Sequence, residues 1–97
     1  MMQLHVEFKI KEGRKEQLQN AVEKIFLPAI SIQKGFKNCY FLLDREDSTK
    51  GELIIAFNSE EERQAWVSAP LHETAWGEVG SNLEVLALKK YDLKAWK

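Results

Sequence analysis

Residues 36–57 read FKNCYFLLDREDSTKGELIIAF and contain two apolar runs on either side of a charged stretch. Aromatic and branched side chains dominate both runs, and such residues favour β-strands. The stretch between them, REDSTKG, is rich in residue types that favour turns. The pattern therefore predicts two strands, residues 36–44 and 52–57, joined as a hairpin.

Period-two alternation identifies a strand before this hairpin and another after it. Residues 3–10, QLHVEFKI, alternate apolar and polar side chains, which is typical of a half-buried strand. Residues 83–93, LEVLALKKYDL, alternate in part and predict a final strand. Between Gly13 and Gly35, apolar residues recur at spacings of three and four and predict an amphipathic helix, whose last turn Pro28 loosens or kinks.

A second helical region follows the hairpin. Ser59 and Glu62 have the spacing of a capping box, which marks a helix start. Pro70 ends this helix and, since proline is tolerated at a first helical position, starts another with Ser68 or Ala69 as its cap. The order strand, helix, strand, strand, helix, strand predicts a single α+β domain over residues 1–97. We expect a ferredoxin-like βαββαβ fold, with both helical regions on one face of an antiparallel sheet.

Two helical regions can cover only one face of that sheet, yet the hairpin strands are apolar on both sides. Phe41 and Leu43 share one side of their strand, while Tyr40 and Leu42 share the other. Strands that are apolar on both sides are typically buried on both faces. An uncovered face of this composition would be larger than the apolar patches that soluble monomers usually expose. The sequence therefore predicts a homodimer, with sheet face against sheet face about a two-fold axis.

Composition excludes several classes of partner. Fourteen basic and fifteen acidic residues are interspersed and give a net charge of −1, so no basic stripe is available for nucleic acid or a membrane surface. The chain has neither the apolar run of a signal peptide nor one long enough to span a bilayer, which predicts a cytoplasmic protein. Cys39 is alone in an apolar segment, which is typical of a small buried side chain.

Three stretches carry a resemblance to a known family: FKIKEGRKEQL at 8–18, LPAISIQKGF at 27–36 and FNSEEERQAWVSAPLH at 57–72. In these the chain resembles the antibiotic-biosynthesis-monooxygenase-like family of dimeric α+β barrels. The resemblance implies a dimer with a pocket in each subunit between helices and sheet. Members of the family include cofactor-independent oxygenases that act on polyphenolic or quinol-like substrates, haem-degrading enzymes, and proteins that process small signalling molecules.

The haem-degrading members use an Asn in the first strand, a Trp in the helix after the third strand, and a His ten residues after that Trp. Trp66 matches the Trp, but Trp76 stands where the His is needed. The first-strand position corresponds to Val6 by strand parity, or to His5 if no gap is allowed. A haem-degrading role is therefore disfavoured, because a metal site depends on the identity and position of its ligands.

His72 is the candidate catalytic residue. It shares a helix face with Ala75, Trp76 and Val79 if the segment after Pro70 is helical. One interpretation is a core histidine that fills space and hydrogen-bonds a backbone carbonyl. The other is that the bend at Pro70 opens an apolar pocket in which His72 is the one group that titrates near neutral pH.

The residues expected to bind a substrate surround this histidine. Trp66 and Trp76 would be walls with indole N–H donors, and the first strand would contribute Val6. Asn38 or Tyr40 would supply a further hydrogen bond. Of the other charged residues, His5 is expected in a polar cluster at the dimer interface, and the acidic run SEEER at 59–63 in a solvated helix start.

The predicted function is a cofactor-independent monooxygenase that acts on a small aromatic, quinol-like or carbonyl compound. No sequence pattern indicates a metal site or an organic cofactor. The alternative is a non-catalytic dimeric protein that binds a small apolar ligand.

Overall fold

The computed structural model describes all of residues 1–97 and forms nine helices and strands. In chain order these are β1 (Met2–Ile10), α1 (Lys15–Ala21), η1 (Val22–Phe26), α2 (Leu27–Ser31), β2 (Phe36–Leu43), β3 (Lys50–Phe57), α3 (Glu60–Val67), α4 (Pro70–Gly80) and β4 (Leu83–Asp92). The four predicted strands and both predicted helical regions are confirmed, with small shifts at the strand ends. No helix combines the length and apolar composition that crossing a bilayer requires.

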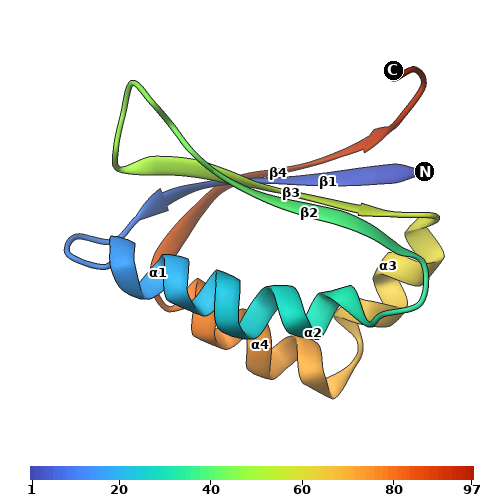
Figure 1. Ribbon diagram of the computed structural model, residues 1–97, viewed down its shortest axis with the longest axis horizontal. Coiled ribbons are helices and arrows are strands. Elements are labelled where there is room, and N and C mark those ends of the chain that lie inside the picture. Colours follow the sequence, from blue (N-terminus) through green and yellow to red (C-terminus); the bar gives the residue numbers. More distant parts are fainter.

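The four strands form one sheet in the order β2-β3-β1-β4, and each neighbouring pair is antiparallel. Figure 1 shows all the helices on one side of this sheet, with α1 and α2 running alongside α4. The predicted ferredoxin-like α+β fold is therefore confirmed. Because the helices occupy one side only, the other face of the sheet carries no covering element from the chain (Figure 1).

The first helical region is one continuous rod made of α1, η1 and α2. In η1 the backbone N–H of Leu27 donates to the carbonyl of Val22, five residues back, as in a π-helix. Pro28 follows in the first turn of α2, where its missing N–H removes one helical hydrogen bond. The irregularity predicted at Pro28 therefore begins one turn earlier than expected, and the wider turn lets the helix continue past the proline.

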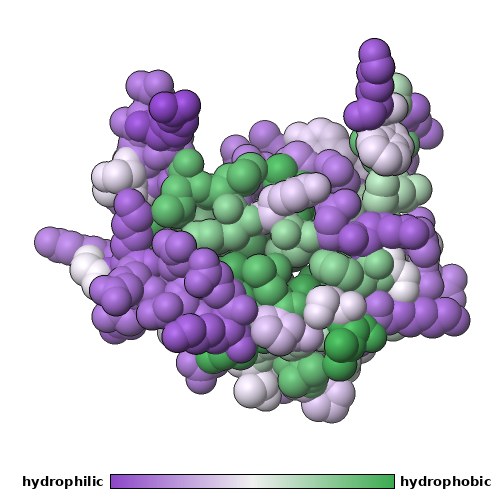
Figure 2. Space-filling view, in the orientation of Figure 1, coloured by the Kyte–Doolittle hydropathy of each residue, from purple (hydrophilic) through white to green (hydrophobic).

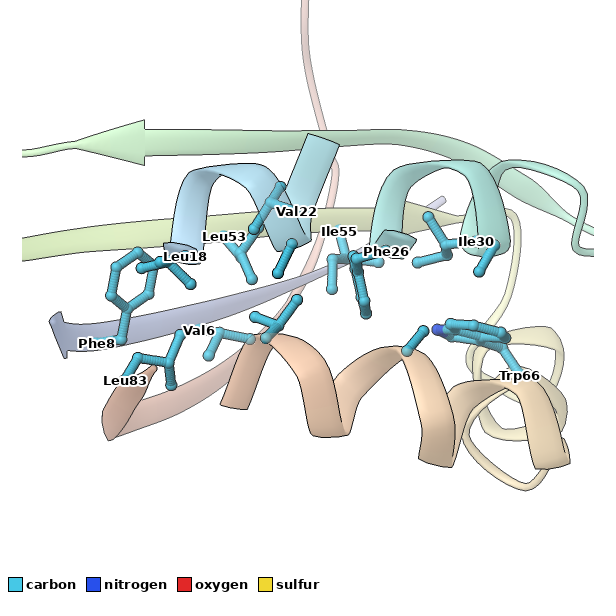
Figure 3. Close-up of a cluster of buried hydrophobic side chains, with 14 of the residues drawn as sticks. Val6, Phe8, Leu18, Val22, Phe26, Ile30, Leu53, Ile55, Trp66 and Leu83 are labelled. Atoms are coloured by element: carbon cyan, nitrogen blue, oxygen red, sulfur yellow. The ribbon is translucent and has the colours of Figure 1, made fainter. Parts of the chain in front are cut away.

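The hydrophobic core lies between the helices and one face of the sheet. Cross-strand pairs such as Val6 with Leu53 and Leu4 with Ile55 share this face, because residues opposite each other point the same way. The largest fully buried side chains come from both layers: Phe8, Leu18, Val22, Phe26, Ile30, Leu53, Phe57 and Val79. Figure 3 labels all of these except Phe57 and Val79. Burial of each such side chain contributes about 1.5–3 kcal/mol relative to exposure, so this layer is the main source of stability.

The sheet face opposite the helices carries exposed apolar side chains. Tyr40, Leu42 and Tyr91 on this face are 55%, 45% and 47% exposed, respectively. The β2–β3 turn and the C-terminal tail rise beyond the two ends of the face (Figure 1). Figure 2, which views the sheet edge-on, shows both projections as largely hydrophilic and apolar side chains in the body of the molecule below them. We refer to the sheet surface opposite the helices, formed by the outward-pointing residues of β1–β4, as the outer face.

A polar cluster lies in the middle of the outer face. The Nδ1 atom of His5 is 2.7 Å from Oε1 of Glu52, and its Nε2 atom is 3.0 Å from Oε1 of Gln3. The ring of Tyr91 packs edge-on against the imidazole, with 4.7 Å between ring centroids. His5 therefore lies on the face opposite the helices, as its strand parity predicted.

The start of α3 is capped as predicted, with one difference. The Ser59 hydroxyl accepts a hydrogen bond from the backbone N–H of Glu62 at 3.2 Å. The Glu62 carboxylate accepts in turn from that hydroxyl at 3.1 Å, rather than from a backbone N–H. Ala69, one of the two expected caps of α4, occupies that position in an extended conformation, immediately before Pro70.

Gly35 adopts a φ of 82°, which favours glycine, and a Cβ atom there would overlap the carboxylate of Glu62. We expect Gly35→Ala to lower the free energy of unfolding by about 2 kcal/mol or more, because backbone strain adds to displacement of the Glu62 cap. Gly13→Ala is a matched control, since its φ is 75° and no atom lies within 4 Å of the added Cβ. Denaturant unfolding should show a smaller loss for this control, of about 1 kcal/mol. Equal losses would mean that Glu62 moves aside at no cost.

Candidate functional site

A pocket of about 320 Å³ lies between the sheet and the helices. Nine of its eleven lining residues are hydrophobic, and the two ionisable ones are Arg63 and His72. Its walls come from β1, η1, β3, α3, α4 and β4: Leu4, Val6, Phe26, Ile55, Arg63, Trp66, Val67, His72, Trp76, Val85 and Leu88. A mostly apolar cavity with a few convergent polar groups is the usual form of a small-molecule site.

Another depression, of about 310 Å³, lies near the β2–β3 turn. Five of its nine lining residues are charged or glycine, including Glu7, Asp44 and Lys50, and none is a histidine or a tryptophan. It is therefore a poorer candidate for binding an apolar ligand than the pocket between the layers.

The bend at Pro70 brings the two key side chains of the pocket together. Because Ala69 is extended and α4 begins at Pro70, the chain changes direction between α3 and α4. Trp66 near the end of α3 then meets His72 in the first turn of α4. Their rings pack edge to face, with 5.0 Å between centroids and 83° between planes.

Phe26 packs against both tryptophans of the pocket, on the helix-facing side of the sheet. Its ring centroid lies 6.1 Å from that of Trp66 and 6.0 Å from that of Trp76, and both contacts are edge to face. Trp66 is only 3% exposed, and its indole nitrogen points along the space between sheet and helices toward Phe26 (Figure 3). The two indoles are therefore fixed walls of the pocket.

His72 lies on the pocket wall and is only half-buried. Hydrogen bonds to histidine side chains form only at His5, so the His72 imidazole keeps both ring nitrogens free of partners within the chain. Burial, and to a smaller extent the positive charge of Arg63, hold the pKa of His72 below its usual value of 6.5. At neutral pH the imidazole is therefore uncharged and able to accept a proton.

Arg63 is a functional candidate that the sequence analysis missed. It was expected in a solvated helix start, but only 7% of the residue is exposed and it lines the pocket. Its Nε and Nη2 atoms donate to the two carboxylate oxygens of Glu60. The hydrogen bonds from Arg63 hold the pKa of Glu60 down at about 2, with help from Lys90, whose Nζ lies 2.6 Å from Glu60 Oε2. The three-residue spacings from Glu60 to Arg63 and from Arg63 to Trp66 were the available signal, because residues three apart share a helix face.

Four of the six site residues proposed from the sequence line this pocket together, namely Val6, Trp66, His72 and Trp76. The other two do not. Asn38 and Tyr40 pair with Ala56 and Ile54 of β3 and point to the outer face, away from the helices. Asn38 and Tyr40 are therefore not part of the candidate pocket, because the sheet lies between these two side chains and the pocket.

Cys39 shares the helix-facing side of β2 with Phe41 and packs against the core. Burial raises the pKa of its thiol to about 12. The side chain is therefore a protonated thiol at neutral pH, in agreement with the small buried side chain expected from the sequence.

The comparisons with known proteins identify the family of the chain and agree with its fold. The family model described as antibiotic biosynthesis monooxygenase matches residues 1–76. The chain belongs to the antibiotic biosynthesis monooxygenase family. A search of curated proteins finds no match. The family match ends within α4, so it includes Val6, Trp66, His72 and Trp76 but not β4.

Solved structures share the fold at low sequence identity. SnoaB, a cofactor-independent oxygenase from Streptomyces nogalater, superposes with a TM-score of 0.86 at 9% identity, covering 98% of this chain and 94% of that one. A provisionally assigned antibiotic biosynthesis monooxygenase from Bordetella bronchiseptica gives a TM-score of 0.86 at 11% identity, covering 97% of both chains. A conserved protein from Methanosarcina mazei gives 0.82 at 9% identity, covering 96% of this chain and 92% of that one. At these identities the likeness establishes the fold alone.

We expect His72 to titrate below 6.5 in the folded antibiotic biosynthesis monooxygenase domain, as followed by NMR of the imidazole protons. The unfolded chain then binds a proton more readily than the folded one, so acidification through about 6.5 destabilises the fold. His72→Gln should remove this part of the loss of stability, whereas His5→Gln should leave it in place. A His72 midpoint at or above 6.5 would contradict this assignment.

Proposed function

We propose that this protein is a cofactor-independent monooxygenase that acts on a small aromatic, quinol-like or carbonyl compound in the pocket between helices and sheet. Membership of the antibiotic biosynthesis monooxygenase family supports monooxygenase activity in general. The observation that carries the finer proposal is His72, an imidazole without hydrogen-bond partners on the wall of an apolar pocket, whose pKa lies below its usual value. A neutral imidazole aimed at a bound ligand is suited to general-base catalysis.

The proposed reaction begins with transfer of a phenolic or enolic proton to His72. The resulting carbanion gives one electron to dioxygen, and the substrate radical combines with superoxide to form a carbon–oxygen bond. The imidazolium of His72 returns its proton to the peroxide anion, and loss of water, which also takes the hydrogen of the former carbanion carbon, leaves a carbonyl there. One oxygen atom enters the product, the other leaves as water, and the substrate itself supplies the electrons, so the protein contributes only a base, an apolar site and donors.

The remaining walls suit a flat aromatic ligand. Trp66 and Trp76 offer two indole surfaces supported by Phe26, and Val6 offers an aliphatic one from the sheet. The volume of about 320 Å³ is at the lower end of the range for small-molecule sites. A compound with one or two rings is therefore the expected size of substrate.

A second candidate function is binding without catalysis. Apart from Arg63, no ionisable group joins His72 in the pocket, so no second general acid or base is present among the lining residues. A protein that sequesters or senses an aromatic ligand needs only the apolar walls and one polar contact. Consumption of dioxygen separates the two functions, because a binder takes up the ligand without turnover.

His72→Ala should lower kcat for a quinol substrate by about 10²- to 10⁴-fold, the usual contribution of a general base. The measurement is dioxygen uptake during incubation with a panel of quinols, with anaerobic incubation as the blank. Thr74→Ala, an exposed position in the same helix, is the control and should keep the wild-type rate. An unchanged rate in His72→Ala would rule out His72 as the base, and binding without uptake in the wild type would favour the non-catalytic alternative.

We also propose that the protein is a homodimer joined through the outer faces of two sheets. The exposed Tyr40, Leu42 and Tyr91 supply an apolar surface for such a contact.

Light scattering should give a mass twice the 11.3 kDa of one chain at micromolar concentration. Tyr40→Glu should convert the dimer to monomer, because it places a charge on the outer face. Ile32→Glu adds the same charge at a side chain that is 76% exposed at the end of α2, away from the sheet, and should leave the dimer intact. A wild-type monomer, or identical masses for the two variants, would contradict the proposed interface.

A further inference from the structure

Arg63 places a fixed positive charge on the wall of a pocket that is otherwise almost entirely apolar. Nine of the eleven lining residues are hydrophobic, and His72 is uncharged at neutral pH because its pKa is lowered. A guanidinium stays protonated under all ordinary conditions. A neutral ligand gains less from a cation in this position than an anionic ligand does, and it would strip water from the cation. The positive charge of Arg63 therefore indicates the charge of the preferred ligand, which the apolar walls do not.

The guanidinium is held so that one edge is occupied and the other is available. Its Nε and Nη2 atoms donate to Glu60, while no hydrogen bond within the chain engages Nη1. Nη1 is also not among the fully buried atoms that lack a partner, so it keeps some accessible surface. The Glu60 clamp fixes the plane of the guanidinium, and a preorganised donor loses little entropy when it binds.

Glu60 is shared between two cations, Arg63 and Lys90, and Nζ of Lys90 lies 2.6 Å from its carboxylate. Glu60 stays ionised because its pKa is held at about 2. Lys90 and Asp92 line a second, more exposed depression together with Glu60, so those two charges lie outside the pocket that Arg63 lines. Glu60 is therefore only partly available to offset the charge of Arg63, and an anionic ligand in the pocket would offset the rest.

We propose that Arg63, clamped by Glu60, is a specificity-determining residue that binds the anionic oxygen of a weakly acidic ligand, so that the pocket selects phenolates and enolates over their neutral forms. The inference rests on the proposed function and narrows its substrate class to compounds whose hydroxyl group ionises readily. Nη1 would donate a charge-assisted hydrogen bond to the ligand oxygen, and such bonds are stronger when water is excluded.

This role also fits the position of His72. Burial and, to a smaller extent, the charge of Arg63 disfavour protonation of His72 in the empty pocket and lower its pKa. A ligand anion beside both groups opposes these effects, because it offsets the charge of Arg63 and attracts the imidazolium. Transfer of the ligand proton to His72 therefore becomes favourable only once an acidic ligand is bound.

The test uses para-nitrophenol, whose phenolate absorbs visible light while its neutral form does not, and para-nitroanisole, the methyl ether that cannot ionise. An apolar pocket without a usable cation favours the neutral phenol and removes the visible absorbance. We expect the wild-type pocket to favour the phenolate instead, so that the bound probe ionises at a lower pH than it does in water. The phenolate should bind about tenfold or more tightly than the ether, as expected for one charge-assisted hydrogen bond.

Three variants separate recognition by Arg63 from general effects on the fold. Arg63→Gln should lose the preference for phenolate while still binding the ether. Glu60→Gln should keep the preference, since Arg63 remains charged and the amide oxygen of the glutamine can still accept one of its hydrogen bonds. Arg45→Gln changes the net charge by the same amount as Arg63→Gln at an exposed site in the β2–β3 turn and should match the wild type. The far-ultraviolet circular dichroism spectrum of each variant should match that of the wild type, which checks that the variant is folded.

A wild type that binds phenolate and ether equally, or that does not bind the phenolate, would overturn the proposal. So would Arg63→Gln and Glu60→Gln weakening both probes alike, because that result indicates a purely structural role for the cluster. These experiments measure binding without dioxygen. Their failure is therefore distinguishable from failure of the proposed oxygenase activity, which depends on dioxygen uptake.

Discussion

The edge-to-face packing of Phe26 against Trp66 and Trp76 joins the core of this protein to its pocket. Phe26 is 1% exposed, belongs to the hydrophobic core, and also lines the pocket. It lies in the π-helical segment η1, where the wider turn shifts the side chains that follow relative to a regular helix. The separation between sheet and second helical region depends on this ring, because both indoles rest against it.

The fold could be predicted because several local sequence patterns each indicate one of its elements. Period-two alternation in residues 3–10 is typical of a strand, and the charged stretch between the hairpin strands is typical of a turn. Pro70 marks the boundary between two helices. The irregular features were not visible in the same way. A π-helical turn differs from an α-helical one by a single residue, and the register shift between Phe36 and Asn38 depends on how β2 pairs with β3. Both features are set by packing between elements, which local patterns do not record.

The site was predictable only in part, for a related reason. Trp66 and His72 were found because helical spacing and the proline bend place them on facing surfaces. Strand parity, by contrast, only divides the residues of one strand between the two faces of the sheet. It does not tell which of these residues lie on the same face as a given residue of another strand. Asn38 or Tyr40 was expected to supply a hydrogen bond in the same pocket as Val6, but the pairing of Tyr40 with Ile54 and of Val6 with Leu53 puts them on opposite faces. Arg63 was overlooked because a charged residue at a helix start is usually solvated, and its burial comes from packing between α3 and distant parts of the chain, which local patterns do not record.

The pocket therefore contains two basic groups with different tasks, and their difference follows from their surroundings. Arg63 keeps its charge because guanidinium ionises at any relevant pH and Glu60 compensates for part of its burial. His72 gives up its charge because it is partly buried, has no acidic partner, and lies near that arginine. An uncharged base beside a permanent cation is a suitable pair for a weak acid, since the base receives the proton and the cation holds the anion that remains. Neither group does this alone: without Arg63 the apolar walls would oppose formation of the anion, and without His72 the proton would have no acceptor in the pocket.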